Sequence, residues 1–236
     1  MSAAGLARLA SRVRLVRLAA VGVAGRRALL VASLPALWPA LLKVFSLLGD
    51  GGAPGAPAVA GWVLGLPCGV LAVALGCRLV ASEVDQRTLE VVYTVPGGAR
   101  RVWLARFAAG AALVLLGELA AALAAFLMLV DVTAFDLLSS WIGALFLLAV
   151  SMLAGALFRS VITGALAAAP VLVLSVLIGG TVRIAPFFSV ASLAEYDPAD
   201  VAAWAFQSRA GFLLATALLV AMAISRAENR EAMLRD

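Results

Sequence analysis

Six long apolar runs alternate with short polar connections along the chain. Most of these runs approach or exceed the ~20 residues that a helix needs to cross the hydrocarbon core of a bilayer. The ~10-residue alternating segments typical of a membrane β-barrel do not occur. The pattern therefore predicts an all-α polytopic membrane protein, with a single transmembrane domain of six spans. The predicted spans cover residues 28–48, 59–80, 102–130, 137–158, 161–180 and 210–224.

Composition supports this class of protein. The 236 residues are 64% hydrophobic and only 13% charged, whereas a soluble domain carries roughly 25% charged residues. The bilayer is therefore the first partner that the sequence predicts.

The basic residues predict the orientation of the spans. With a cytoplasmic N-terminus, 15 of the 18 lysines and arginines flank the spans on the cytoplasmic side. The positive-inside rule then places both termini in the cytoplasm, with the protein in the cell membrane. Because topology accounts for the net charge of +5, the charge does not indicate nucleic-acid binding.

The N-terminal segment predicts a helix lying on the membrane surface. Residues 1–27 hold six arginines and no acid, with apolar residues at helical spacing. This combination is typical of an interfacial helix on anionic headgroups. A cleavable signal peptide is the alternative, but its basic region would be shorter.

The outer connection, 181–209, is too apolar for a free loop. Its segments Pro186-Phe187-Phe188 and 201–206 predict two short re-entrant helices dipping into the outer leaflet. A loop lying flat at the interface with an aromatic anchor is the alternative.

A polar stretch with several arginines, residues 82–101, separates spans two and three. Ser82 and Asp85 fit the start of a helix with a capping box, and Pro96-Gly97-Gly98 would end it. We therefore predict a short cytoplasmic helix over 82–95. A solvated interfacial loop is the alternative interpretation.

The order of residues in this stretch resembles the first cytoplasmic loop of ABC type-2 exporter permeases. That loop carries a pattern close to E-x-x-x-G-T-L-E, followed by S/T-x-P, a basic pair and L-G-K. The chain has Glu83-x-x-x-Arg87-Thr88-Leu89-Glu90, then Thr94-Val95-Pro96, Arg100-Arg101 and Leu104-Ala105-Arg106. It departs from the pattern at Arg87, where glycine is usual, and at Ala105-Arg106, which replace Gly-Lys.

The resemblance implies a permease subunit of an ATP-driven exporter, a transport subunit and not an enzyme. It would pair with a second copy or a homologous permease and with ABC ATP-binding subunits. ATP and Mg would bind to those subunits, because this chain has no G-x-x-x-x-G-K-[ST] loop. An ATP-independent scaffold or regulatory membrane subunit is the alternative. The 82–95 helix would be the coupling helix, and the resemblance assigns ATPase docking to Glu83, Asp85, Arg87, Thr88, Leu89, Glu90 and Pro96.

Two charged residues lie within the predicted spans. Glu118 is near the middle of the third span, where a charge costs roughly 2.5–3.5 kcal/mol on insertion scales. It should therefore face the bundle interior and be protonated or paired, with Lys43 of the first span as a candidate partner. Both are candidates for the translocation path. The alternatives are a structural polar contact for Glu118 and, for Lys43, an ammonium group that extends to the outer surface.

The sequence gives little support for metal binding, catalysis or a disulfide. The chain has no histidine, and Cys68 and Cys77 point to opposite faces of one predicted helix, so they cannot form a disulfide. We expect no metal site, no cofactor on this chain and no catalytic residues. Gly61-x-x-x-Gly65-x-x-x-Gly69 predicts close helix packing, more readily within one subunit than between two.

Overall fold

The computed structural model describes most of the chain. The predicted interfacial helix over 1–27 lies almost wholly outside the described part, so it stays a prediction. The described residues are Gly22, Ala24, Gly25, 27–48, Gly55, 59–86, Thr88, Glu90, Tyr93, Thr94, 98–178, 184–188, 196–229 and Met233.

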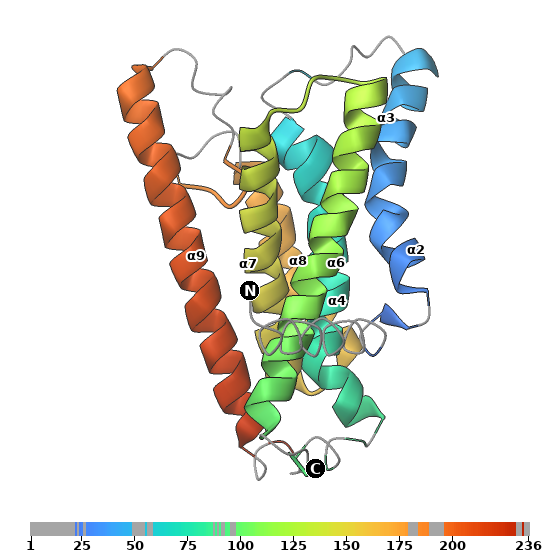
Figure 1. The fold of residues 1–236 in the computed structure, drawn as a ribbon, viewed down its shortest axis with the longest axis vertical. Coiled ribbons are helices and arrows are strands. Elements are labelled where there is room, and N and C mark those ends of the chain that lie inside the picture. Colours follow the sequence, from blue (N-terminus) through green and yellow to red (C-terminus); the bar gives the residue numbers. More distant parts are fainter. Residues whose placement is uncertain are drawn as a thin grey trace, which may run out of the picture.

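The described residues form helices joined by turns and loops, with no strand among them (Figure 1). Six helical stretches are long and apolar enough to cross a membrane, which confirms the all-α class and a multi-pass membrane protein. In chain order the elements are α2 (Ala28–Ser33), η1 (Leu34–Ala36), α3 (Leu37–Leu48), η3 (Val59–Gly65), α4 (Leu66–Asp85), α6 (Ala99–Met128), α7 (Ala134–Phe158), α8 (Val161–Ile178) and α9 (Pro198–Glu228).

The first two spans are each built from several elements. In the first span, α2 and α3 are joined by the 3₁₀ turn η1, which contains Pro35. Proline removes a helical hydrogen bond and disturbs the helix before it. The change from α-helix to 3₁₀ helix therefore coincides with Pro35. The second span opens with the π-helical segment η3 and continues without interruption into α4.

The second span extends further than the sequence predicted. We expected it to end at residue 80 and a new helix to begin at Ser82, but α4 continues to Asp85. The Ser82 hydroxyl donates a hydrogen bond of 2.5 Å to the Arg78 carbonyl, inside the same helix. The predicted capping box at Ser82 is therefore wrong, and residues 82–85 form the last turn of α4.

The last span also begins earlier than predicted. Helix α9 begins at Pro198, and the Asp197 carboxylate accepts a hydrogen bond of 3.0 Å from the Ala199 backbone N–H. An aspartate at this position satisfies one of the free N–H groups of a helix start. Residues 201–206 are thus the beginning of α9, so the predicted second re-entrant helix is wrong.

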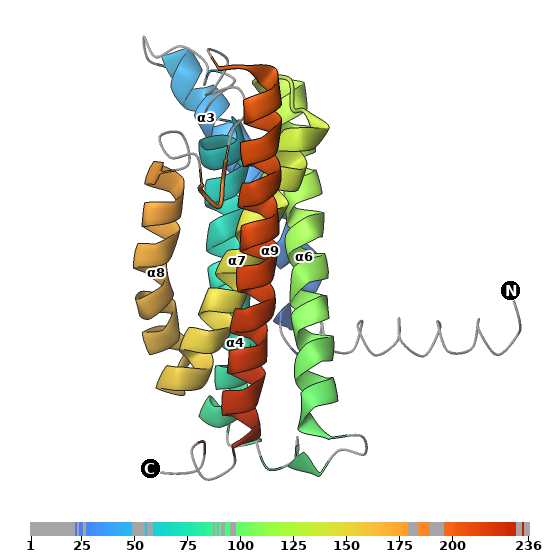
Figure 2. The same cartoon turned by 90° about the vertical axis from the view of Figure 1, so that its left-hand side faces the viewer.

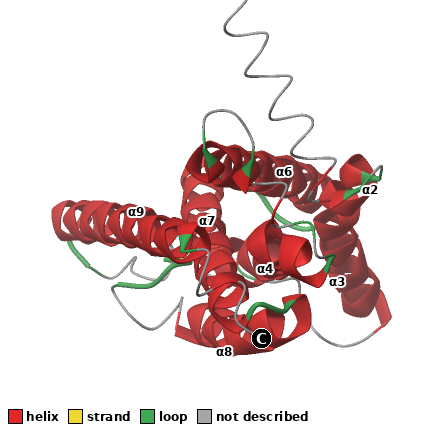
Figure 3. Cartoon of the chain, turned by 90° about the horizontal axis from the view of Figure 1, so that it is seen from below, coloured by secondary structure: helices red, strands yellow, loops and turns green. Residues whose placement is uncertain are grey.

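The α4 helix lies at the centre of the bundle. Seen from below, it is surrounded by α3, α6, α7 and α8 (Figure 3). Helices α6 and α8 lie on opposite sides of α4 and α7 (Figure 2). The peripheral α9 packs mainly on α7.

The central α4–α7 contact depends on two glycines. A Cβ atom at Gly76 would lie 2.6 Å from the Leu148 carbonyl oxygen, and one at Gly155 would lie 2.7 Å from the Cys77 carbonyl oxygen. Neither position has room for a side chain. The backbones of the two helices therefore touch, as small residues permit in membrane bundles.

At other glycines, large side chains of the same chain pack against the helix backbone. A Cβ at Gly65 would lie 2.8 Å from the fully buried Phe187 ring, and one at Gly69 would lie 2.5 Å from Leu172. Gly61 has nothing within 4 Å of its Cβ position. Two glycines of the predicted motif thus serve packing within one subunit, as expected.

A similar contact ties the first span to α6. A Cβ at Gly117 would lie 2.8 Å from the Ala32 carbonyl oxygen and 3.2 Å from the Pro35 ring. The interrupted part of the first span therefore rests directly on the α6 backbone.

We predict that Gly76→Ala lowers the melting temperature of the purified protein, because the added methyl group must force α4 and α7 apart. Overpacking of this kind costs about 1–3 kcal/mol. Thermal unfolding in detergent measures the effect. Gly61→Ala, a substitution in the same span but in open space, is the matched control and should show no such loss. Equal losses in both variants would contradict the assigned role of the α4–α7 contact.

Candidate functional site

An ion pair joins the end of α4 to the beginning of α6. The Arg106 guanidinium on α6 forms an ion pair with the Glu83 carboxylate on α4, and both side chains are only 14% exposed. Arg106 also donates a hydrogen bond of 3.1 Å to the Leu79 carbonyl oxygen. Its guanidinium lies 5.4 Å from the ring centroid of Trp103, within the range of a cation–π contact. Arg106 therefore bridges two spans at their polar ends.

The chain after α4 folds back on the same carboxylate. The Thr88 hydroxyl donates to the second carboxylate oxygen of Glu83. The Thr88 backbone N–H donates to the Glu83 carbonyl at 2.9 Å. Both oxygens of Glu83 thus have partners, and its charge is compensated by Arg106. These contacts fix Thr88 against the last turn of α4.

Two further contacts reach α8 and α9. The Asp85 carboxylate accepts a hydrogen bond of 3.3 Å from the backbone N–H of Val161, the first residue of α8. The Tyr93 hydroxyl donates a hydrogen bond of 2.6 Å to the Ala227 carbonyl near the end of α9. The last turn of α4 and the stretch that follows it thereby take part in contacts that join four spans. We call this set of contacts the four-helix junction; its residues are Glu83, Asp85, Thr88, Tyr93, Arg106, Val161 and Ala227.

The predicted docking residues separate into different environments. Glu83 contacts both Thr88 and Arg106, whereas Asp85 and Glu90 are exposed at the surface. Their docking role stays a prediction. The remaining predicted docking residues, Arg87, Leu89 and Pro96, lie outside the described part of the chain.

Glu118 is enclosed in the bundle, as its position in the sequence predicted. The side chain is 0% exposed. The Ser140 hydroxyl on α7 lies near it, but neither carboxylate oxygen has a hydrogen-bond partner of ordinary geometry. Glu118 is thus a polar group in an apolar environment.

The suggested pairing of Glu118 with Lys43 is wrong. Lys43 is partly exposed on α3, and the ion pair recorded between described residues is Glu83–Arg106. The first span packs against α6 through its small residues, while Glu118 is near Ser140 on another helix.

Residues 185–188 are buried between the helices at the other end of the bundle, next to the exposed Ile184. Figure 1 shows this segment below the upper ends of α6 and α9. Its carbonyl groups accept hydrogen bonds from Ser139 on α7, at 2.5 Å to Phe188, and from Ser208 on α9, at 3.1 Å to Ala185. In its described part, the first predicted re-entrant segment therefore enters the bundle, as a turn rather than a helix.

Arg209 on α9 fixes the same segment. Its guanidinium donates a hydrogen bond of 3.4 Å to the Phe188 carbonyl and another of 3.0 Å to the Ala205 carbonyl. It lies 4.0 Å from the ring centroid of Phe135 on α7. This arginine, only 9% exposed, joins α7, α9 and the segment between α8 and α9.

Sequence reasoning did not single out several of these residues. Arg106 belonged to the resemblance but was not assigned as the partner of Glu83. Neither Tyr93 nor Arg209 had an assigned role. The sequence offers one signal for the two arginines. Charged residues are rare within and beside membrane spans, and those that occur there need partners.

The described residues contain no group of three or more histidine, cysteine, aspartate or glutamate side chains that could hold a metal ion. Cys68 and Cys77 are buried and free.

Comparison with protein-family models, curated proteins and solved structures finds no match to this chain.

We predict a measurable coupling energy between Glu83 and Arg106. Replacing one partner leaves a half-buried charge unpaired, whereas replacing both removes the two charges together. Contacting residues in such cycles typically show coupling of about 0.5–3 kcal/mol. Unfolding of Glu83→Gln, Arg106→Gln and the double variant in detergent gives the value. Strictly additive losses would contradict the assigned pair.

We predict that Glu118→Leu does not lower the melting temperature. An apolar residue of similar size removes an unpartnered polar group from an apolar site, and such exchanges are often neutral or stabilising. Glu118→Ala serves as the comparison, because it leaves a cavity and should destabilise the protein. A marked loss of stability in Glu118→Leu would reveal a polar partner that this interpretation omits.

Proposed function

We propose that this chain is the permease subunit of an ATP-driven ABC exporter. It would form a translocation path with a second permease copy or a homologous one and bind separate ATP-binding subunits. The four-helix junction carries this proposal, because a partner that binds the loop between α4 and α6 would act beside contacts that join four spans. The proposal assigns ATP and Mg to the partner subunits and transport to this chain.

The packing of the bundle explains how a movement of the junction would spread. Glu83 and Arg106 connect α4 to α6, and Asp85 connects α4 to α8. Direct backbone contact connects α4 to α7. A displacement applied at the junction would therefore move these helices together, as rigid-body switching requires.

The surface around the junction suits a soluble partner. Asp85, Glu90, Arg100 and Arg101 are exposed there, so the surface presents charges of both signs. Charge complementarity of this kind favours specific docking. The positive-inside pattern supports a cytoplasmic location for this end, where ATP is available.

Under this proposal Glu118 is closed off in the conformation described. It lies on α6 near Ser140 of α7 and is fully buried. It would line a path only after α6 and α7 move apart. Lys43, partly exposed on α3, remains a candidate for the opposite end of the path.

We predict that Glu90→Lys weakens binding of the ATP-binding subunit. Reversal of an exposed charge places like charges opposite each other, and a tenfold loss of affinity corresponds to about 1.4 kcal/mol. The chain would be purified with its co-expressed ATP-binding subunit, and retained subunit and ATP hydrolysis would be measured together. Glu90 is the best position for this test, because Glu83 and Asp85 also hold the chain's own helices.

Glu228→Lys is the matched control, since Glu228 is exposed near the end of α9 but outside the junction. It should retain the ATP-binding subunit at the wild-type level. Unchanged retention and hydrolysis in Glu90→Lys would contradict docking at this loop. A working assembly that contains no ATP-binding subunit would instead support a scaffold or regulatory role.

A further inference from the structure

Glu118 lies at the depth of the bilayer centre by its place in α6. Helix α6 ends at Met128, and a helix rises about 1.5 Å per residue, so Glu118 lies about 15 Å from that end. This depth is half of a hydrocarbon core of about 30 Å. The side chain is fully buried, and neither carboxylate oxygen has a hydrogen-bond partner among the described residues. An ionised carboxylate here would be far from bulk water and without a donor.

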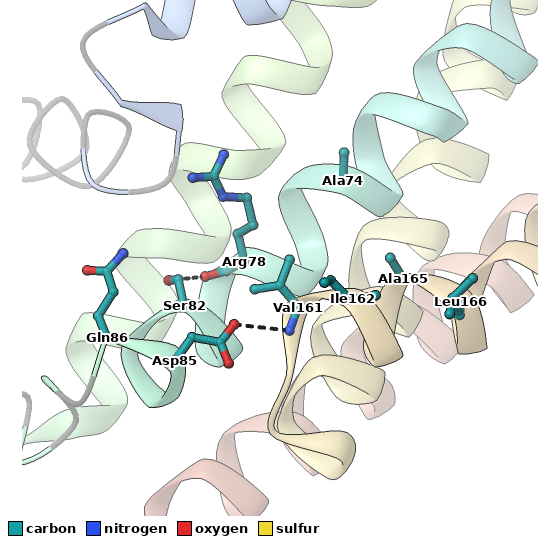
Figure 4. Close-up of a pocket in the computed structure, with 9 residues that line it drawn as sticks. All are labelled: Ala74, Arg78, Ser82, Asp85, Gln86, Val161, Ile162, Ala165 and Leu166. Atoms are coloured by element: carbon teal, nitrogen blue, oxygen red, sulfur yellow. Dashed lines mark hydrogen bonds between the residues drawn. The ribbon is translucent and has the colours of Figure 1, made fainter.

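Three other acids beside the spans each have a donor. Glu83 pairs with the Arg106 guanidinium. Asp85 accepts a hydrogen bond from the first backbone N–H of α8 (Figure 4), and Asp136 accepts one from the backbone N–H that precedes α7. Donors of this kind stabilise the ionised form of a carboxyl group. Their absence at Glu118 indicates a neutral acid, because burying an unpaired charge costs far more than burying a neutral polar group.

The surroundings of Glu118 supply no counter-charge in the described part of the chain. No charged side chain contacts it, and the titratable group near it on α4 is the fully buried, free thiol of Cys68. Lys43 on α3 is partly exposed, and Arg209 on α9 contacts carbonyl groups and an aromatic ring. The remaining charges of these helices lie toward the end of α4, the beginning of α6 and the two ends of α9. The elements α2, η1 and η3 carry no titratable side chain.

Ser140 on α7 is the second polar group of this site. It lies near Glu118, is fully buried and has no hydrogen-bond partner in the described part of the chain. Ser82 and Ser151 instead donate to the carbonyl four residues earlier in their own helices, as Figure 4 shows for Ser82. The Ser140 hydroxyl is therefore left for Glu118. A hydroxyl and a protonated carboxyl group complement each other because each can both donate and accept, whereas an ionised carboxylate only accepts.

We propose that Glu118 and Ser140 form a proton-binding site at the centre of the bundle. In the conformation described, the carboxyl group carries the proton and shares a hydrogen bond with the Ser140 hydroxyl. When water reaches the site, the O–H bond breaks, the proton passes to water and an ionised carboxylate remains. The inference does not rest on the proposed transport function, because it concerns a buried contact between α6 and α7 and not the exposed loop at Glu90.

Infrared spectroscopy tests the protonation directly. The protein, with any subunits that co-purify, is measured at neutral pH in a maltoside detergent, which has no carbonyl group. We expect the wild type to show the carbonyl stretching band of a protonated carboxylic acid, and Glu118→Gln to lose it. Glu118→Leu should lose the same band. Glu228→Gln, the same substitution at an exposed acid, is the matched control and should keep it, while thermal unfolding checks that each variant is folded.

Ser140→Ala tests the second member of the site. The variant should keep the band and move it to higher frequency, because a carboxyl group that loses a hydrogen bond has a stiffer C=O bond. An unmoved band would contradict the assigned role of Ser140.

The pH dependence of unfolding gives an independent measurement. An exposed glutamate ionises with a pKa of about 4.3, so above this pH the folded protein holds one proton that the unfolded chain releases. The folding equilibrium constant of the wild type should therefore fall, relative to that of Glu118→Gln, by up to about tenfold for each unit of rising pH. The fall ends where the folded site itself loses its proton.

Several results would overturn the proposal. One is a wild type without the protonated-acid band at neutral pH, and another is survival of this band in Glu118→Gln. Equal pH dependence of unfolding in the wild type and Glu118→Gln would also contradict it. If Glu118→Gln instead loses a carboxylate band, and sodium ions stabilise the wild type but not the variant, Glu118 is ionised and binds a cation in place of a proton.

Discussion

The direct contact between the backbones of α4 and α7 is the constraint on which the rest of the fold depends. Gly76 and Gly155 leave no space for a side chain at the contact. In a bilayer the surrounding lipid is as apolar as the helices, so close packing has to supply much of the association energy. With these two helices in contact, α6 and α8 occupy opposite sides of the pair, and α9 packs on the remaining face of α7.

The polar contacts lie where this packing brings helix ends together. Glu83, Asp85 and Arg106 each satisfy a group on a neighbouring element and leave the interior of the bundle apolar. At the other end, Arg209 makes the corresponding contacts with backbone carbonyls and aromatic rings. Ionic groups therefore join the helices near their ends, where the cost of removing charge from water is lower than at the bilayer centre. Glu118 is the exception, which is why its replacement is informative.

The sequence predicted the number and character of the spans because length and apolarity alone decide which segments can cross a bilayer. It predicted the helix ends less well. Ser82 has a side chain suited to a helix start, but the same hydroxyl can bond to the carbonyl of Arg78 within a continuing helix. Residues 201–206 predicted a short re-entrant helix, yet α9 begins before them, at Pro198, with Asp197 as its cap.

The sequence predicted where the candidate site lies, but not which of its residues contact each other. The pattern from Glu83 to Arg106 covers the region where these contacts lie. However, the pairing of these two residues depends on how the long helix α6 returns beside α4, and local sequence does not specify this. The partner of Lys43 was predicted from depth alone, and depth does not say which face of α6 carries Glu118.

The contact between Gly117 and the interrupted first span has a consequence for how α6 can move. Successive residues on a helix are about 100° apart around its axis. Any turn of α6 that brings Glu118 or Leu116 to the place of Gly117 would drive a side chain into the Ala32 carbonyl oxygen, which already lies 2.8 Å from the Cβ position of that glycine. Rotation of α6 is therefore blocked unless the proline-containing turn of the first span is displaced with it, so the orientation of the buried acid is tied to the shape of the first span.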